Sequence, residues 1–429
     1  MMDKKLAIDG GIAIRNKPLP QEWCGTHHID GREAEAVLGV IESHSLFRYY
    51  GPNLRREVEK LEEEFAAYNG VTHALAVSSG TAALQVALGA LGVGPGDEVI
   101  VPGYFWVATV GAVVRSGAVP VLADVDDSFS LDPDKLKEKI SARTKAVIPV
   151  HMGGVIGRIG EIVKVAHAAG VKVLEDCAQA CGASQHGIKA GAFGDIAIYS
   201  FQLNKNMTSG EGGMVVTNDA SLYRRAFAIH DLGYPRVNGR LVFNDESTQL
   251  WGIGARMGEL PAAVARVQLA KLDGICGNMR SAKNRIKYGI SDIKGITVRR
   301  VIDPAGDSGA FLKLTFENRD VSLYFVTALK AEGIVGAPGA FYPIHMDDWG
   351  LHIYYNIPSL VNKRGISQVS PWDLTENSAS AGVSYGKGTC PRLDDLVSRT
   401  IIICVASNLA DDDVNDIIAA IRKVAAHLL

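Results

Sequence analysis

One lysine and a glycine-rich turn lie together in the segment Ser200-Phe201-Gln202-Leu203-Asn204-Lys205-Asn206-Met207-Thr208-Ser209-Gly210-Glu211-Gly212-Gly213. The residues on either side, 195–201 and 213–218, are mostly apolar, which favours two strands joined by this turn. Desolvation at such a position penalises the charged ammonium and favours the neutral amine that can form a Schiff base. Lys205 is therefore the first catalytic candidate, although most lysines of a soluble protein are surface charges.

A carboxylate follows a second apolar segment upstream. Residues 171–175 run into Asp176, which predicts a buried strand that ends in an acid. The carboxyl ends of parallel strands are the places where α/β sheets bind ligands. A lysine and an aspartate at one sheet edge are the pair that pyridoxal phosphate chemistry needs, one as Schiff-base amine and one as partner of the pyridinium nitrogen. We therefore predict that Lys205 and Asp176 are catalytic.

Strands and helices alternate along the first half of the chain, which predicts an α/β fold with a mainly parallel sheet covered on both faces. The expected strands are 73–79, 98–102, 119–125, 145–151 and 171–177, and the expected helices are 31–43, 53–68, 81–91, 105–116, 132–141 and 158–169. We predict a large domain over residues 1–280, with an N-terminal arm at 1–30. A smaller α+β domain is predicted over 281–429, with a loop-rich stretch at 336–391.

The composition excludes several classes of function. The chain has 429 residues, of which 47% are hydrophobic and 21% charged, and its formal net charge is −3. No basic block interleaved with aromatic residues is present, so nucleic acid is not an expected partner. Apolar runs such as 400–406 have the length of a strand, so we expect no membrane span. Only three apolar residues stand between Lys5 and Asp9, so we expect no signal peptide. Six scattered cysteines without zinc-like spacing favour a reducing cytoplasm and no metal site.

A phosphate site is predicted where Ser78-Ser79-Gly80-Thr81 ends a strand and opens a helix. The first amides of a helix have no partner within it, and together with the helix dipole they attract an anion. The Thr81 hydroxyl can add a hydrogen bond. The alternative is a plain helix cap without a ligand. The presence of Lys205 and Asp176 in the same predicted sheet favours the phosphate site at Gly80 and Thr81.

Three motifs resemble those of the DegT/StrS group of fold-type I aminotransferases, and they occur in the expected order. They are Ser-Gly-Thr-Ala-Ala-Leu at 79–84, Glu-Asp-x-Ala-Gln-Ala at 175–180 and Ser-Phe-Gln-x-x-Lys-x-x-Thr-x-Gly-Glu-Gly-Gly at 200–213. The resemblance runs from about Tyr49 to the C-terminus. It implies a homodimeric, pyridoxal-phosphate-dependent enzyme that moves an amino group from glutamate or glutamine to a polyhydroxylated ketone or aldehyde. Related sugar dehydratases carry histidine where this chain has Lys205.

The resemblance also assigns cofactor contacts. It implies that Ser200 contacts the phosphate, that the Trp106 ring stacks on the pyridine, and that Gln179 hydrogen-bonds near the ring oxygen. The alternatives are that Trp106 belongs to the core and that the Gln179 amide faces solvent.

Substrate contacts are expected at Arg48, Gln202, His345 and Arg256. The alternative for Arg48 is a packed surface arginine. The histidines of the stretch 345–352 could also bind a metal, but their spacing fits no metal motif. We therefore favour an exposed loop over the pocket. Gln202, where nucleotide-sugar members often have histidine, is more similar to members that act on cyclitols, amino-benzoate precursors or free sugar acids.

The chain departs from the family pattern at one position. The family asparagine that reaches the phosphate of the neighbouring subunit is replaced by Gly254, in the stretch 252–257. This contact could then come from Arg256, from a backbone N–H, or from no group of the neighbour. Three functions remain open from the sequence: a keto-sugar or keto-cyclitol aminotransferase, a pyridoxal phosphate enzyme of another reaction class, and a non-catalytic regulator that keeps the fold.

Overall fold

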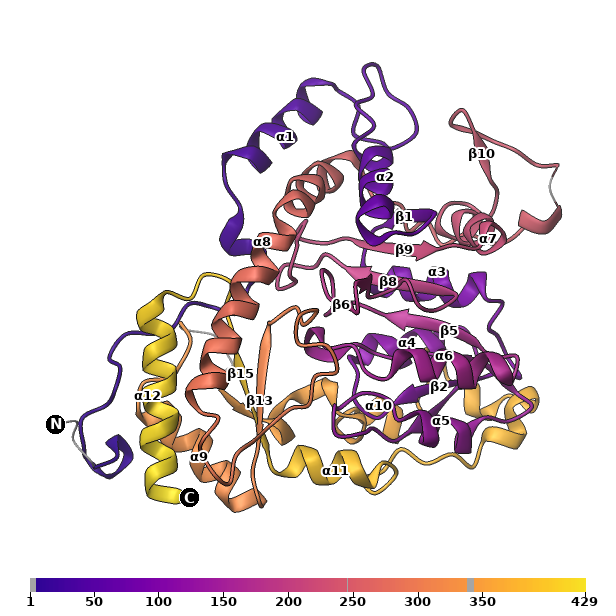
Figure 1. Ribbon diagram of the computed structural model, residues 1–429. Coiled ribbons are helices and arrows are strands. Elements are labelled where there is room, and N and C mark those ends of the chain that lie inside the picture. Colours follow the sequence, from indigo (N-terminus) through magenta and orange to yellow (C-terminus); the bar gives the residue numbers. More distant parts are fainter. Residues whose placement is uncertain (1–4, 245, 338–342) are drawn as a thin grey trace.

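A seven-stranded sheet forms the centre of the computed structural model, which describes residues 5–244, 246–337 and 343–429 (Figure 1). The strand order is β1-β9-β8-β5-β4-β2-β3. Strand β9 is antiparallel to both of its neighbours, and the pairs from β8 to β3 are parallel. A mainly parallel sheet is therefore confirmed. The strands are β1 (His73–Val77), β2 (Glu98–Pro102), β3 (Val119–Ala123), β4 (Thr144–Val147), β5 (Lys172–Asp176), β8 (Ile196–Ser200) and β9 (Gly213–Thr217).

Helices cover both faces of this sheet, and two apolar clusters form on its two sides. One cluster contains residues of α2, α6 and α8, and the other contains residues of α3, α4 and α7. Strands buried on both faces explain the continuous apolar runs in the sequence. The helices are α1 (Gly31–Glu42), α2 (Glu57–Asn69), α3 (Gly80–Ala90), α4 (Val107–Arg115), α5 (Pro133–Lys139), α6 (Ile159–Ala168), α7 (Ala220–His230) and α8 (Glu259–Gly289).

A second, antiparallel sheet has the order β12-β13-β15-β14. Its strands are β12 (Thr297–Val298), β13 (Phe311–Thr315), β14 (Ile344–His345) and β15 (Thr400–Cys404). Helices α9 (Arg319–Ala331) and α12 (Asp411–Leu428) accompany it, and α10 (Pro358–Val361) and α11 (Pro391–Ser398) lie in the connecting region (Figure 1). Two small hairpins complete the strands: β6 (Ser184–Gln185) with β7 (Ile188–Lys189), and β10 (Arg236–Val237) with β11 (Arg240–Leu241).

The helix starts follow local capping chemistry. Asp30 and Glu33 form a capping box at α1, and the Ser79 side chain accepts the amide of Ala82 at the start of α3. The expected helix 53–68 begins at Glu57 instead, because Arg56 has a φ of +59°, outside the helical region.

Helix α8 has 31 residues and runs through the predicted domain boundary at 280/281. The later chain also returns to the first sheet, because Trp372 and Leu393 belong to the apolar cluster that contains α3 and α4. The Tyr385 hydroxyl donates to the carbonyl of Pro120 at 2.5 Å. The division at 280/281 therefore stays a prediction.

The predicted loop-rich stretch 336–391 consists mainly of short 3-10 turns, and its residues 338–342 lie outside the described residues. None of the helices in the described ranges is long and apolar enough to cross a membrane.

Candidate functional site

Lys205 lies in the loop that joins β8 to β9. The loop is closed at its base, where Phe201 and Gly212 share a backbone hydrogen bond of 2.9 Å and the Ser209 amide donates to the Phe201 carbonyl. The Lys205 amide donates to the Gln202 carbonyl at 2.9 Å, so the lysine stands at the end of a tight turn. Because β8 and β9 are antiparallel neighbours, the turn projects from the edge at which β8 ends.

Asp176 ends β5, the strand next to β8, and its carboxylate acts on the charge of Lys205. Burial lowers the pKa of Lys205, while the charge of Asp176 opposes this shift. Burial raises the pKa of Asp176, and an N–H from Ala178, the Thr109 hydroxyl and Lys205 oppose that shift. The structure thus brings the predicted amine and carboxylate to one sheet edge.

Thr109 is a site residue that the sequence analysis did not identify. Its Oγ1 donates a hydrogen bond of 2.8 Å to Oδ2 of Asp176, and Thr109 itself is fully buried. The available signal was its position in the first turn of α4, three residues after the predicted cofactor contact Trp106.

Gly80 and Ser200 form a narrow cradle at the start of α3. A Cβ added to Gly80 would lie 2.7 Å from the Cβ of Ser200 and 3.1 Å from its Oγ, so only glycine fits there. Thr81 follows in the first turn and is exposed. The amides at this helix end have no partner within the helix and favour an anion. The predicted phosphate residues Gly80, Thr81 and Ser200 are therefore neighbours.

Trp106 presents a partly exposed ring, with 42% of its surface accessible, at the carboxyl end of β2. The ring lies 4.7 Å from the ring of His352, centroid to centroid, and His352 in turn stacks on Trp349 at 4.2 Å. These contacts place an aromatic surface beside the lysine, because the charge of Lys205 acts on His352.

His352 is the second residue that the sequence analysis did not assign. Its Nδ1 lies 2.9 Å from the Trp349 carbonyl oxygen, which can only accept, so Nδ1 carries the proton and Nε2 is the basic nitrogen. Burial lowers the pKa of His352 to about 4, so the ring is neutral at pH 7. Because His352 follows Lys205 by a long stretch of chain, no local motif links the two.

Gln179 and Gln202 have defined side-chain partners. Oε1 of Gln179 accepts a hydrogen bond of 2.9 Å from the Gly153 amide, which orients the Gln179 side chain. Oε1 of Gln202 accepts the amide of Asn204 at 3.1 Å and helps shape the lysine turn.

Three predicted substrate contacts have other partners in the chain. Arg48 is paired with Glu62 at 2.8 Å, Arg256 is paired with Asp231, and Nε2 of His345 lies 3.0 Å from the Ser322 hydroxyl. Both arginines thus have a compensated charge, and His345 is buried beneath α9. An intrachain partner does not test a substrate contact, so the roles of these three residues stay predictions.

A group with metal-ligand chemistry lies behind Asp176. His151, Glu175 and Cys177 each offer one possible ligand atom, and these three atoms lie within 4.8 Å of one another. Glu175 also accepts three backbone amides, from Gly191, Phe193 and Gly194, at 2.7–3.0 Å. Since His151 contacts it at 2.9 Å as well, the Glu175 carboxylate is satisfied without an ion.

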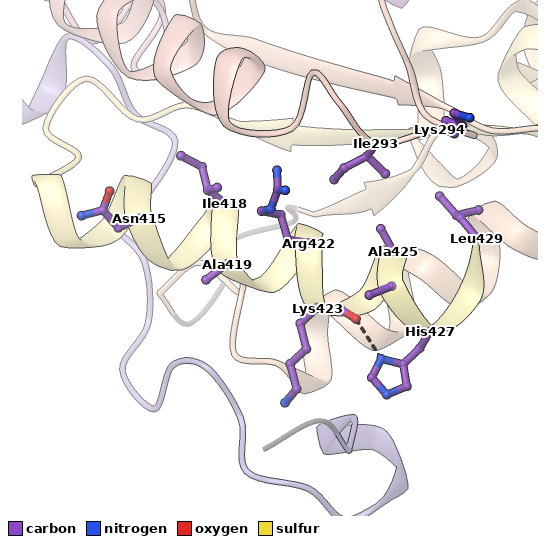
Figure 2. Close-up of a pocket in the computed structure, with 11 residues that line it drawn as sticks. Ile293, Lys294, Asn415, Ile418, Ala419, Arg422, Lys423, Ala425, His427 and Leu429 are labelled. Atoms are coloured by element: carbon purple, nitrogen blue, oxygen red, sulfur yellow. Dashed lines mark hydrogen bonds between the residues drawn. The ribbon is translucent and has the colours of Figure 1, made fainter. Parts of the chain in front are cut away.

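A groove of about 720 Å³ lies along α12, between that helix and residues 293 and 294 (Figure 2). Its lining includes the apolar residues Ile418, Ala425 and Leu429 and the cationic residues Arg422 and Lys423. The predicted site residues lie on other elements, so this groove is separate from the lysine site.

The residues around Lys205 fit pyridoxal phosphate. The cradle at Gly80 and Ser200 suits a phosphate, the exposed face of Trp106 suits a flat ring, and the buried carboxylate of Asp176 suits a protonated ring nitrogen. A protonated nitrogen near Asp176 would favour the ionised carboxylate against the effect of burial.

Comparison with known proteins agrees with this geometry. Residues 27–356 match the DegT/DnrJ/EryC1/StrS aminotransferase family. The chain is 31% identical to the spore coat polysaccharide biosynthesis protein SpsC of Bacillus subtilis, over 92% of this chain and 95% of that protein. It is 33% identical to a putative L-glutamine:3-amino-2,3-dideoxy-scyllo-inosose aminotransferase of Micromonospora echinospora, over 81% and 82%. The crystal structure of 3-amino-5-hydroxybenzoic acid (AHBA) synthase superposes with a TM-score of 0.75 at 28% identity, over 96% of this chain and 98% of that chain.

These matches confirm the family resemblance and the fold-type I architecture that the sequence motifs implied. They also favour amino transfer over the other reaction classes that the sequence left open. The chain therefore belongs to the DegT/DnrJ/EryC1/StrS aminotransferase family and depends on pyridoxal phosphate.

Proposed function

We propose that this aminotransferase moves an amino group from L-glutamine or L-glutamate to a keto-cyclitol, a keto-sugar or a sugar aldehyde in aminosugar or aminocyclitol biosynthesis. The observation that carries the proposal is the half-buried Lys205 opposite the buried Asp176, next to the Gly80 cradle. The names of the relatives support an acceptor of this kind, since one is named as a putative L-glutamine:3-amino-2,3-dideoxy-scyllo-inosose aminotransferase and another as 3-amino-5-hydroxybenzoic acid synthase.

Bound pyridoxal phosphate supplies an aldehyde that reacts with amines and a ring that takes up electrons when a Cα–H bond breaks. In our proposal the Lys205 amine would hold the cofactor. As general base and acid it would then move a proton from the donor Cα to the cofactor in the first half-reaction, and from the cofactor to the acceptor carbon in the second. The lowered pKa of Lys205 favours the neutral amine that this proton transfer requires.

The other residues bind and orient. We assign the phosphate to Gly80, Thr81 and Ser200 and the ring face to Trp106. Asp176 would accept the ring N–H, and Thr109 holds the Asp176 carboxylate through the 2.8 Å hydrogen bond.

Substrate recognition is assigned to the open side of the site. We assign the hydroxylated acceptor to Gln202 and the aromatic surface at His352, and we assign Gln179 to a contact near the cofactor ring. Neutral amides and imidazoles exchange hydrogen bonds with hydroxyl groups without repelling them.

A homodimer is part of the proposal. Several apolar side chains are exposed around the 46–50 loop and the segment 232–253, where Trp251 is 94% and Tyr50 is 66% accessible. The cation of Arg236 lies 4.4 Å from the centre of the Tyr49 ring, so the two segments contact each other. Large exposed apolar patches of this kind mark interfaces.

Gly254 lies close to this patch. Its φ of +65° is a left-handed conformation that glycine and asparagine both tolerate, and the space at its Cβ position is open. This backbone would also accept the asparagine of the family pattern.

A reducing compartment, the cytoplasm, is also proposed. All six cysteines are unpaired, and five of them are buried. Free buried cysteines are typical of proteins that work under reducing conditions.

The experiment that tests the function follows the two halves of the reaction separately. The protein loaded with pyridoxal phosphate is mixed with L-glutamine, L-glutamate or L-alanine, and the cofactor absorption and the keto product are followed. The aminated protein is then given scyllo-inosose, a free keto-sugar or a nucleotide-linked keto-sugar, and the amine product is identified by mass. We expect L-glutamine or L-glutamate to aminate the protein-bound cofactor. We also expect the aminated protein to transfer this amino group to an acceptor that carries no nucleotide. Amination of only the nucleotide-linked sugar would narrow the acceptor class, and no conversion with either donor would refute the proposal.

A further inference from the structure

A short piece of the N-terminal arm lies against the lysine loop. We call residues 23–28 the strap. The Gly25 amide donates to the Lys205 carbonyl at 2.9 Å, and Oγ1 of Thr26 donates to the Leu203 carbonyl at 2.8 Å. Two hydrogen bonds therefore connect the strap to the backbone of the residue that we assign to catalysis and to the backbone of Leu203, two residues before it.

The other side of the strap is fixed to two distant elements. Oγ of Ser407, just after β15, donates to the Cys24 carbonyl at 2.7 Å. Nζ of Lys271, in α8, donates to the His28 carbonyl at 2.6 Å. The strap thus joins the second sheet and the long helix to the lysine loop.

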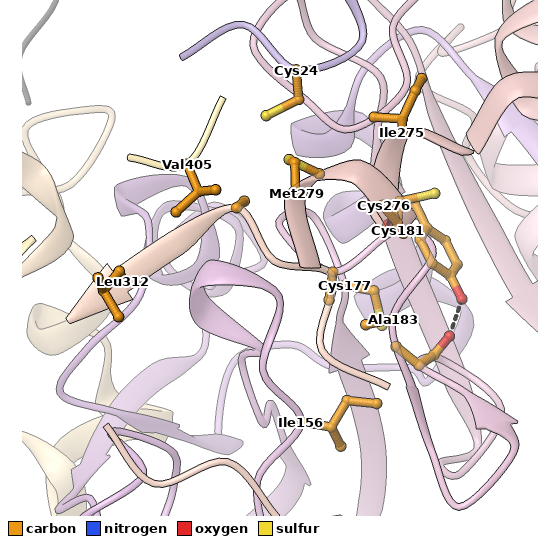
Figure 3. Packing of buried hydrophobic residues seen from close by; sticks show 14 of the residues in the cluster. Cys24, Ile156, Cys177, Cys181, Ala183, Ile275, Cys276, Met279, Leu312 and Val405 are labelled. Atoms are coloured by element: carbon orange, nitrogen blue, oxygen red, sulfur yellow. Dashed lines mark hydrogen bonds between the residues drawn. The ribbon is translucent and has the colours of Figure 1, made fainter. Parts of the chain in front are cut away.

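The side chain of Cys24 is part of a buried apolar cluster (Figure 3). The cluster includes Cys276 and Met279 of α8, Leu312 of β13 and Val405 after β15. Since this packing buries Cys24 to 3% exposure, the strap is anchored by its core contacts as well as by hydrogen bonds.

Gly25 makes a close approach that a side chain would prevent. A Cβ at this position would lie 2.9 Å from Oε1 of Gln268, 3.0 Å from the Asn206 carbonyl oxygen and 3.1 Å from the Lys205 carbonyl oxygen. Its backbone has ordinary helical angles, with φ −70° and ψ −33°, which alanine also adopts. A side chain at Gly25 would therefore press on the carbonyls of the lysine loop, so space, and not backbone conformation, favours glycine here.

We propose that the strap is a positioning element of the active site, with Gly25 and Thr26 setting the place of the Lys205 backbone and linking it to the second sheet. The inference rests on the proposed role of Lys205. A lysine amine reaches its target through four methylene groups, so a shift of its backbone moves the amine as well. A displacement of about 1 Å in a catalytic group can cost two orders of magnitude in rate.

The first test compares Gly25→Ala with Gly31→Ala. A Cβ at Gly31 would meet no atom within 4 Å, so this variant controls for the change from glycine to alanine. We expect Gly25→Ala to slow the half-reaction with L-glutamine by about tenfold or more. It should also shift the pH midpoint of the cofactor absorption, which reports on the lysine-bound cofactor. Gly31→Ala should match the unchanged protein in both measurements.

A second pair of variants applies if Gly25→Ala does not fold. Thr26→Val removes the hydroxyl donor with little change in volume, and Thr26→Ser keeps the donor. We expect a slower half-reaction and a shifted pH midpoint for Thr26→Val and normal values for Thr26→Ser.

Normal rates and pH midpoints in folded Gly25→Ala and Thr26→Val would overturn the inference. That outcome differs from failure of the proposed function, which would appear as normal amino transfer by Lys205→Ala.

Discussion

The Oγ1 of Thr109 donates a hydrogen bond of 2.8 Å to Oδ2 of Asp176, while the Ala178 amide donates to Oδ1 at 3.1 Å. Both oxygens of this buried carboxylate therefore have a donor, and its plane is fixed. A fixed, ionised carboxylate is what a protonated ring nitrogen requires, because hydrogen bonds to the charged form oppose the effect of burial. Thr109 is thus a positioning residue for Asp176.

The first prediction concerns this hydrogen bond. Thr109→Val removes the donor at nearly constant volume and should slow the half-reaction with L-glutamine by about tenfold, since hydrogen bonds to charged groups contribute about 1.5–3 kcal/mol. The cofactor absorption should also titrate at a different pH. Thr109→Ser keeps the hydroxyl and should behave as the unchanged protein. Equal rates in the valine and serine variants would contradict the role of Thr109.

The second prediction concerns the cradle. Gly80→Ala places a Cβ at 2.7 Å from the Ser200 Cβ, so the cradle closes and the affinity for pyridoxal phosphate should fall about tenfold or more. Gly111→Ala, inside α4, meets no atom within 4 Å and should keep the normal affinity. Absorbance titration with pyridoxal phosphate measures both. An unchanged affinity in Gly80→Ala would exclude a phosphate at this position.

The third prediction concerns pH. Burial lowers the pKa of His352 from 6.5 to about 4, so between these values the unfolded chain binds a proton that the folded chain does not. The free energy of unfolding therefore falls as the pH falls through this window, by at most about 1.4 kcal/mol per pH unit from this group. His352→Phe keeps a ring against Trp349 and removes the titration. Urea unfolding from pH 6.5 to 4 should show a shallower pH dependence for the variant, and an identical dependence would contradict the assignment.

The fourth prediction concerns assembly. Trp251 is 94% accessible in the patch that we assign to the homodimer, and Tyr288, at the end of α8, is 84% accessible outside it. Trp251→Ser should weaken self-association, because a buried aromatic side chain at an interface centre often contributes at least 2 kcal/mol. Tyr288→Ser should leave it unchanged. Sedimentation velocity over a range of concentrations distinguishes the two variants. A stable dimer of Trp251→Ser would show that the interface lies on another surface.

The sequence predicted the part of the site that depends on local patterns. Lys205 and Asp176 follow apolar strands of one sheet, and Gly80 opens a helix directly after another strand, so strand ends alone bring them close together. The alternation of strands and helices likewise predicted the mainly parallel sheet, although nothing local marked β9 as antiparallel.

Other side chains have partners on other elements that no local motif identifies. Arg48 pairs with Glu62 on the next helix, and His345 contacts Ser322 on α9, so their substrate contacts stay predictions. His352 reaches the lysine site only through the folding of the second half of the chain. The predicted boundary at 280/281 falls within α8, whose buried positions continue on both sides of it.

The central claim is that the amine of Lys205 carries the cofactor and moves the proton. The most direct measurement compares amino transfer from L-glutamine in the unchanged protein, Lys205→Ala and Lys205→Arg, with cofactor absorption recorded in each. We predict that both variants lose the absorption of the lysine-bound cofactor and slow transfer by at least about a thousandfold, since neither side chain supplies a neutral amine. Transfer by Lys205→Ala at the rate of the unchanged protein would contradict the account.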